Sequence, residues 1–141
     1  MVIADTGFWV ALANPRDKYN QIAKQHMQII LKQREQLITT CAVMTETCHL
    51  LLRELGTTAQ QNFIELYHCQ GFTLFELNVS HANRIAELMS KYSNLPMDLA
   101  DASLVILAEH LGHGRILSTD QRDFGVYRWK QTHPFVNLMF S

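Results

Sequence analysis

The chain has 141 residues and a formal net charge of −1, and 48% of its residues are hydrophobic. This length favours one domain over residues 1–141, with a core large enough to need no disulfide staples. The near-neutral charge excludes a protein that holds nucleic acid by bulk positive charge, so such contact needs a local basic patch. No apolar run reaches the roughly 20 residues of a membrane helix, and the first residues do not resemble a signal peptide.

Short apolar runs alternate with helical segments along the chain. Strands are expected at residues 1–4, 36–39, 72–76, 115–118 and 135–138. Helices are expected at residues 6–13, 17–34, 41–55, 57–69, 80–92 and 98–111. This alternation predicts an α/β fold with a mostly parallel central sheet of about four to five short strands, flanked by helices on both faces.

Single residues mark the helix boundaries. Pro15 disfavours helical geometry at Asn14, and Asp17 is a candidate N-cap for the second helix. Gly56 and Gly112 are suited to ending the third and last helices. No disulfide framework is expected, because the three cysteines, Cys41, Cys48 and Cys69, are odd in number and lack CxxC spacing. They are expected to be reduced and mostly buried, as in a cytoplasmic protein.

Four acidic residues are expected to meet at one edge of the sheet. Asp5 and Asp120 each follow a strand directly, and ligands bind beyond the carboxyl ends of parallel strands. Glu46 lies within the third helix, and Asp101 lies near the start of the apolar helix at 98–111. Clustered carboxylates repel one another and lose solvation unless a cation lies between them. The pattern therefore indicates a site for a divalent cation with oxygen ligands.

The acids at the strand ends also have ordinary structural explanations. Asp5 is placed to cap the next helix, although Thr6 is available for that role. Asp120 begins the stretch 120–123, which has the composition of a turn. Taken singly, neither residue indicates a function.

The acids on helices have such explanations too. Glu46 is compatible with a solvated helix face. Asp98 is the natural N-cap of the last helix, which places Asp101 at the third helical position, where the helix dipole favours an acid. The indication of a metal site comes from two strand-end acids and two helix-borne acids at one edge.

Other site patterns are incomplete. Glu46-x-x-His49 has the spacing of di-iron bundles but lacks a second such pair, and His110 and His113 lack cysteine partners at zinc spacing. The chain has no glycine-rich phosphate loop and no G-x-S-x-G elbow. Nucleotide binding by such loops is thereby excluded, and the sequence offers no nucleophile elbow.

The chain resembles the PIN-domain ribonucleases, specifically the VapC type of toxin in toxin–antitoxin pairs. The matching segments are Ile3-Ala4-Asp5-Thr6, Thr45-Glu46, Leu99-Ala100-Asp101-Ala102-Ser103-Leu104-Val105 and Ile116-Leu117-Ser118-Thr119-Asp120-Gln121-Arg122-Asp123-Phe124. The resemblance covers essentially the whole chain, and it implies that Asp5, Glu46, Asp101 and Asp120 take the four acidic positions. Asp98 is an additional acid that could join the metal ligands.

The resemblance implies a Mg²⁺-dependent endoribonuclease, with Mn²⁺ as a substitute. Asp5 and Asp101 would be the principal ligands, while Glu46 and Asp120 would hold metal-bound waters or a second ion. Thr6, Ser118 and Thr119 would orient these ligands from behind. The family motif often has Ser or Asn where this chain has Gly7, so one hydroxyl or amide is missing.

Partners follow from the same resemblance. Structured RNA is the expected substrate, a small antitoxin with a basic residue would cover the site, and the chain would form a homodimer. Candidate contacts to the RNA backbone are Arg16, Lys18, Arg115, Arg122 and Arg128. Tyr19 is a candidate for stacking a base, whereas core packing is favoured for Trp9.

Two other functions are compatible with the residues. One is a non-catalytic PIN-like module that binds RNA or a protein, with the acids serving as helix caps; binding of divalent metal would distinguish it. The other is a phosphatase with Asp5 as nucleophile, which ordinarily needs Asp-x-Asp and is disfavoured by Gly7.

Overall fold

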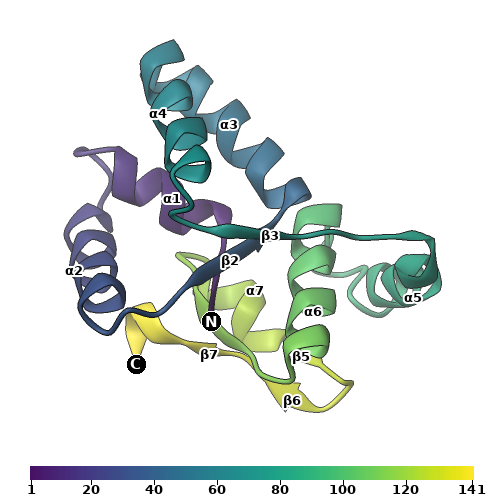
Figure 1. Ribbon diagram of the computed structural model, residues 1–141. Helices are drawn as coiled ribbons and strands as arrows, with labels where there is room; N and C mark the ends of the chain where they lie inside the picture. Colours follow the sequence, from purple (N-terminus) through teal and green to yellow (C-terminus); the bar gives the residue numbers. More distant parts are fainter.

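Five short parallel strands form the central sheet, in the order β3-β2-β1-β4-β7 (Figure 1). The computed structural model describes residues 1–141. The strands are Val2–Ala4 (β1), Leu37–Thr40 (β2), Thr73–Phe75 (β3), Arg115–Leu117 (β4) and Val136–Asn137 (β7). The expected α/β class and the number of strands are confirmed.

The central position of β1 follows from its composition. It pairs with β2 on one side and β4 on the other, and Val2, Ile3 and Ala4 are completely buried. Ile116 and Leu117 of β4 are buried as fully. Strands covered on both faces need such continuous apolar runs, so the most apolar segments occupy the middle of the sheet.

Seven α-helices surround the sheet. They are Thr6–Ala13 (α1), Asn20–Lys32 (α2), Cys41–Leu55 (α3), Thr57–His68 (α4), Ala82–Lys91 (α5), Leu99–Leu111 (α6) and Gln121–Val126 (α7). With this strand order, right-handed crossovers place α1 to α4 on one face and α5 to α7 on the other. None of the helices is long and apolar enough to cross a membrane.

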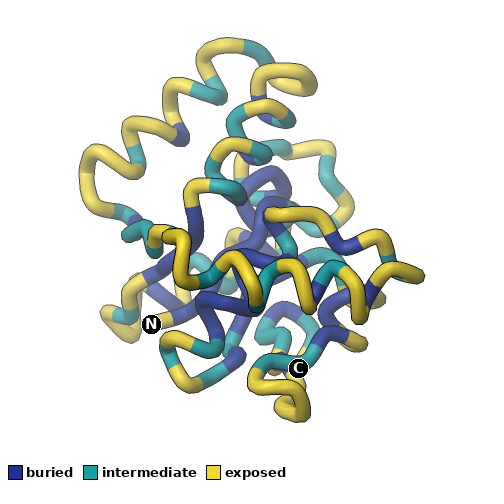
Figure 2. The backbone as a smooth tube through the Cα atoms, turned by 90° about the vertical axis from the view of Figure 1, so that its right-hand side faces the viewer, coloured by how far each residue is buried: buried dark blue, intermediate teal, exposed yellow.

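The core lies between the helical layers, where Figure 2 shows the buried segments gathered inside an exposed outer shell. Residues 102–108 of α6 are all buried, as the apolar composition of that helix predicts. Trp9 is only 2% exposed, and its ring packs against Phe63 and Phe72 at centroid distances of 5.4 and 4.8 Å. Trp9 therefore serves the core, as favoured, and does not stack a base.

Two elements differ from the sequence-based expectation. Residues 121–126 form the short helix α7 where a turn was expected, because the first turn of a helix and an isolated turn share their residue preferences. Arg128–Trp129 (β5) and His133–Pro134 (β6) pair as an antiparallel hairpin that was not predicted. This hairpin turns through Lys130 and Gln131, which both adopt positive φ angles.

Two local expectations were also wrong. Asp17 does not cap α2. Its Oδ1 accepts a hydrogen bond from the Tyr19 backbone N–H at 2.9 Å, and α2 begins only at Asn20. The cysteines are free as expected, but Cys41 and Cys69 are exposed and Cys48 is half-buried. Cys48 packs against the core, whereas Cys41 at the start of α3 and Cys69 just after α4 do not.

Candidate functional site

An acidic pocket of about 440 Å³ lies beyond the carboxyl ends of β1 and β4. Its walls hold seven carboxylates and a single cationic side chain, that of Arg122. The carboxylates belong to Asp5, Asp17, Glu46, Asp98, Asp101, Asp120 and Asp123. The structure thus brings together the four acids expected to converge and also Asp98, and it adds Asp17 and Asp123, which were not expected at this site.

Asp5 is held by donors on both of its carboxylate oxygens. Its Oδ1 accepts from the Thr6 backbone N–H at 2.8 Å, which makes Asp5 the cap of α1 in place of Thr6. Its Oδ2 accepts from the Ser118 hydroxyl at 2.8 Å. Burial, together with the nearby charges of Glu46 and Asp120, raises the pKa of Asp5 to about 6 despite these donors.

Ser118 connects Asp5 to two other segments. Its hydroxyl accepts from the Asp120 backbone N–H at 3.0 Å, and its backbone N–H and C=O bond the side-chain amide of Asn137 at 3.3 and 2.8 Å. The role expected for Ser118, orienting a candidate ligand, has a geometric basis here. Asn137 was missed, because nothing in the sequence shows that β7 lies beside β4.

Asp101 reaches the pocket from the first turn of α6. Asp98 caps this helix, accepting from the Asp101 backbone N–H at 2.8 Å, as expected. The hydroxyl of Tyr127 donates to Asp101 Oδ2 at 3.0 Å. Burial and the charges of Asp98 and Asp5 raise the pKa of Asp101 to about 7, and the tyrosine hydrogen bond opposes this shift. Tyr127 was missed by the sequence analysis.

Glu46 lies on α3, half-buried, within two turns of the end of β2. The cap of α3, Thr40, shares a buried hydrogen bond with Ser103 of α6, with 2.6 Å between the two hydroxyl oxygens. This bond ties the helix that carries Glu46 to the helix that carries Asp101.

Asp120 and Asp123 line the part of the pocket that lies at the start of α7. Asp120 Oδ1 accepts from the Asp123 backbone N–H at 2.9 Å and so caps the helix. Burial raises the pKa of Asp120. Asp123 is buried, and its Oδ1 accepts from Arg122 Nε at 3.0 Å. The only cation in the pocket wall is therefore already paired with one acid.

Gly7 and Thr119 face each other in the pocket wall. A Cβ atom at position 7 would lie 1.9 Å from Thr119 Oγ1, well inside any permitted contact. The hydroxyl of Thr119 thus occupies the space into which a side chain at position 7 would extend. The neighbouring Thr6 hydroxyl is buried in the pocket wall without a hydrogen-bond partner.

The donor set suits a hydrated divalent cation. No three His, Cys, Asp or Glu side chains converge as they would around a closely caged ion. Mg²⁺ does not need such a cage, since it keeps several waters and binds through one or two carboxylates. Seven acids with one paired arginine, and raised pKa values on Asp5 and Asp101, leave a deficit of positive charge that such an ion would fill.

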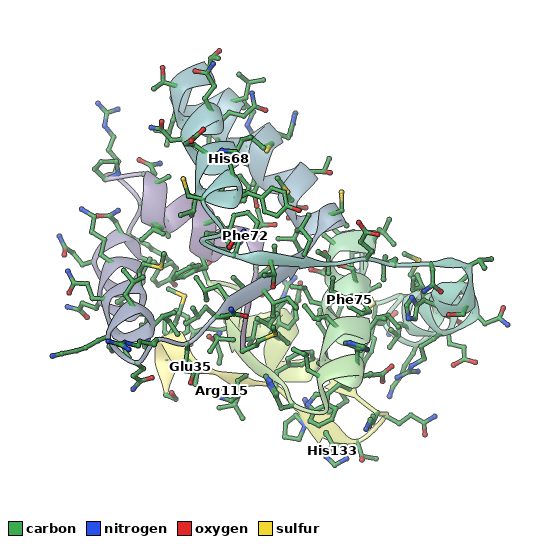
Figure 3. The ribbon with its side chains drawn as sticks, viewed as in Figure 1. Glu35, His68, Phe72, Phe75, Arg115 and His133 are labelled. Atoms are coloured by element: carbon green, nitrogen blue, oxygen red, sulfur yellow. The ribbon has the colours of Figure 1, made fainter.

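The five expected RNA-contacting cations are dispersed. Arg122 lines the pocket, and Arg16 and Lys18 are exposed on the α1–α2 connection beside Asp17. Arg115 begins β4, so it lies at the amino ends of the strands, where it pairs with Glu35 at 2.9 Å (Figure 3). Arg115 therefore does not flank the pocket as expected.

Arg128 is engaged elsewhere as well. Its guanidinium donates to the backbone carbonyls of Gly125, Val126 and Tyr127 at 2.9 to 3.1 Å, at the end of α7. It does not line the pocket. Tyr19, the candidate for base stacking, packs edge-on against Phe140 at 5.3 Å between ring centroids. Both residues have structural roles that their positions in the sequence did not disclose.

The PIN domain family model matches residues 2–130. Among solved structures, the crystal structure of Mycobacterium tuberculosis VapC20, described as a toxin that cleaves the sarcin–ricin loop, is similar with a TM-score of 0.75. The two chains are 19% identical, and the match covers 86% of this chain and 92% of that one, so the likeness concerns the fold. No match is found among curated proteins. The family match over most of the sequence shows that the chain belongs to the PIN domain family.

Proposed function

We propose that this protein is an endoribonuclease, the toxin of a VapC-type toxin–antitoxin pair, which hydrolyses phosphodiester bonds of structured RNA with Mg²⁺ or Mn²⁺. The observation that carries the proposal is the acidic pocket, where seven carboxylates face one arginine at the carboxyl ends of the strands. The fold is shared with VapC20, which is described as an RNA-cleaving toxin, and this likeness supports the same class of reaction.

The residues divide into three roles. Asp5 and Asp101 would hold the cation, and Glu46, Asp120 and the exposed Asp98 would hold its waters. When bound, one or two such ions lower the pKa of water and offset the charge of the scissile phosphate. Ser118 keeps Asp5 in place through the 2.8 Å hydrogen bond. Thr6 and Thr119 line the same pocket wall and would orient ligands from behind; the Thr6 hydroxyl is buried there without a hydrogen-bond partner.

The acidic pocket alone would repel an RNA strand, so RNA binding would depend on a cation that offsets this charge. Once the charge of the acids is offset, Arg122 at the pocket and the exposed Arg16 and Lys18 are the cations placed to contact phosphates. Arg115 and Arg128 are bound to acceptors of the fold and are not included in this proposal.

The partners are proposed from the resemblance to the VapC type. A small antitoxin would insert a basic side chain among the pocket acids, which lack paired cations apart from Arg122. The protein would act in the cytoplasm as a homodimer of single-domain chains, each spanning residues 1–141.

The first test is cleavage of total cellular RNA by the purified, antitoxin-free protein, with Mg²⁺, Mn²⁺ or EDTA and beside the Asp5→Asn variant. Discrete products that need metal and vanish in the variant are expected. The competing function, a non-catalytic binding module, predicts no products and no metal binding by calorimetry. Metal binding without products from total RNA would direct the search to a rarer RNA, since the module alone should bind no metal.

A further inference from the structure

Tyr127 lies behind the acidic pocket and is completely buried. Its hydroxyl donates to Asp101 Oδ2 at 3.0 Å, across 26 residues of sequence. Its ring packs edge-on against the rings of Tyr92 and Phe124, with centroid distances of 5.0 and 5.2 Å. Within this buried aromatic cluster, the Tyr127 hydroxyl is therefore the polar atom that is directed at a candidate metal ligand.

The backbone on both sides of Tyr127 is also fixed. Its N–H donates to the carbonyl of Asp123 at 2.9 Å, at the end of α7. The following N–H, of Arg128, donates to the hydroxyl of Tyr92 at 2.9 Å, and the Arg128 guanidinium bonds the carbonyl of Tyr127 itself. With ring and backbone both held, the hydroxyl has one place to lie, and that place is beside Asp101.

This contact decides which oxygen of Asp101 is available to a ligand. Oδ2 is engaged by the tyrosine, whereas no protein group hydrogen-bonds Oδ1, and Asp101 lines the acidic pocket. A carboxylate without such a donor would rotate about its terminal bond, which has broad torsional preferences. Groups that bond the outer side of a metal-binding carboxylate fix its orientation, and losing them typically costs about 10–100-fold in metal affinity or activity.

We infer that Tyr127 is the positioning residue for Asp101: its buried hydroxyl holds one carboxylate oxygen so that the other faces the cation. The inference rests on the proposed metal-dependent function and extends it to a residue outside the acidic set. Tyr127 touches neither the pocket nor the substrate, since it is fully buried and absent from the pocket wall.

The chain offers a matched control in Tyr92. This residue is also buried and belongs to the same aromatic cluster, but its hydroxyl accepts from the Arg128 backbone N–H instead of bonding an acid. Tyr127→Phe and Tyr92→Phe each remove one buried hydroxyl and keep the ring. If Tyr127 had only a structural role, the two changes should have similar effects on metal affinity. If Tyr127 positions Asp101, Tyr127→Phe should weaken metal binding more than Tyr92→Phe.

The experiment is calorimetric titration of Mn²⁺ into the metal-free wild type and the two variants, after checking each fold by circular dichroism. Tyr127→Phe should weaken Mn²⁺ binding by about 10–100-fold. It should lower kcat for RNA cleavage with little change in KM. Tyr92→Phe loses one backbone hydrogen bond near Tyr127 but keeps the Tyr127 hydroxyl, so it should weaken Mn²⁺ binding far less. Equal Mn²⁺ affinity of wild type and Tyr127→Phe would overturn the inference.

Failure of the proposed function gives a different result. A wild type that binds Mn²⁺ but cleaves no RNA removes the nuclease assignment, and the affinity comparison still decides the role of Tyr127. A wild type that binds no Mn²⁺ removes both, since no cation is then present for Asp101 to face.

A second measurement avoids substitution of Tyr127. The chain has four tyrosines, so 3-fluorotyrosine labelling gives four ¹⁹F signals. Replacing Tyr19, Tyr67 or Tyr92 by Phe assigns three of them and leaves the fourth to Tyr127. Titration with diamagnetic Mg²⁺ should shift the Tyr127 signal most. An unchanged Tyr127 signal at saturating Mg²⁺ would contradict the inference.

Discussion

The two edges of the central sheet, at the amino ends and at the carboxyl ends of the strands, differ in how their acidic side chains are paired. At the amino ends of the strands, Glu35 accepts hydrogen bonds from both terminal nitrogens of Arg115 at 2.9 and 3.2 Å, and the N-terminal amine lies 4.0 Å away. At the carboxyl ends, seven carboxylates share a pocket with Arg122 alone. One edge balances its charge within the chain, and the other does not.

The difference is visible in the acids themselves. The hydrogen bond from Arg115 lowers the pKa of Glu35, whereas burial and like charges raise the pKa values of Asp5 and Asp101 to about 6 and 7. Evolution of a stable fold alone favours the first arrangement, because unpaired buried carboxylates destabilise a protein. The second arrangement is expected where an external cation completes the charge balance, and the predictions below test this contrast in order of effect.

The largest expected effect is the change of folding stability with pH when no metal is bound. Asp5 and Asp101 have higher pKa values in the folded chain than the ordinary aspartate value of about 3.8, so the folded state holds more protons than the unfolded state between about pH 4 and pH 7. Stability therefore falls as pH rises through this window. Allowing for the partial exposure of Asp101, the loss between pH 5 and pH 8 should be on the order of 2 kcal/mol. Thermal unfolding in EDTA measures it.

Metal should reverse this loss, because a bound cation favours the ionised carboxylates. At pH 8, adding Mn²⁺ should raise Tm by several degrees, and at pH 5 the gain should be smaller. Asp101→Asn serves as the control, since it removes one of the two titrating groups and should flatten the pH profile. A wild-type profile in EDTA that falls from pH 5 to pH 8 no more steeply than that of Asp101→Asn would contradict the charge deficit.

An effect of similar size is expected from the pair Gly7 and Thr119. Gly7→Ala places a methyl group 1.9 Å from Thr119 Oγ1, and overpacking of this kind costs about 1–3 kcal/mol, more than alanine gains over glycine in a helix. Thr119→Ala removes the clashing hydroxyl and should restore much of the stability of Gly7→Ala. Urea unfolding of the two single variants and the double variant measures this coupling. Additive effects would show that the two side chains do not compete for one space.

The sequence predicted the acidic edge well because topology places it. Asp5 and Asp120 each follow a parallel strand, and Asp98 and Asp101 are three residues apart at a helix start, so local sequence features place each of these residues. The strand order β3-β2-β1-β4-β7 was not predicted, because the apolar runs show which segments are strands but not which strands are neighbours.

The supporting residues could not be predicted in this way. Tyr127 reaches Asp101 across 26 residues and Asn137 reaches Ser118 across 19, through packing that no local pattern encodes. Asp123 looked like a turn residue, because Asp120 accepts its N–H both in a turn and in the helix α7 that forms. Arg115 seemed close to the site because it lies five residues before Asp120, but β4 separates it from the pocket.

The smallest effect, and the sharpest test of the two edges, compares two arginines. Arg115→Ala removes a partly exposed ion pair with Glu35, which should cost less than about 1 kcal/mol, and it should leave RNA cleavage unchanged. Arg122→Ala, at the pocket, should instead raise KM for RNA severalfold and reduce the dependence of KM on salt, because a phosphate contact is lost. Steady-state cleavage at two salt concentrations distinguishes the edges. If Arg115→Ala raised KM as much as Arg122→Ala, RNA would have to extend around the sheet to its amino edge, and the separation of a charge-balanced edge from a substrate-binding edge would be lost.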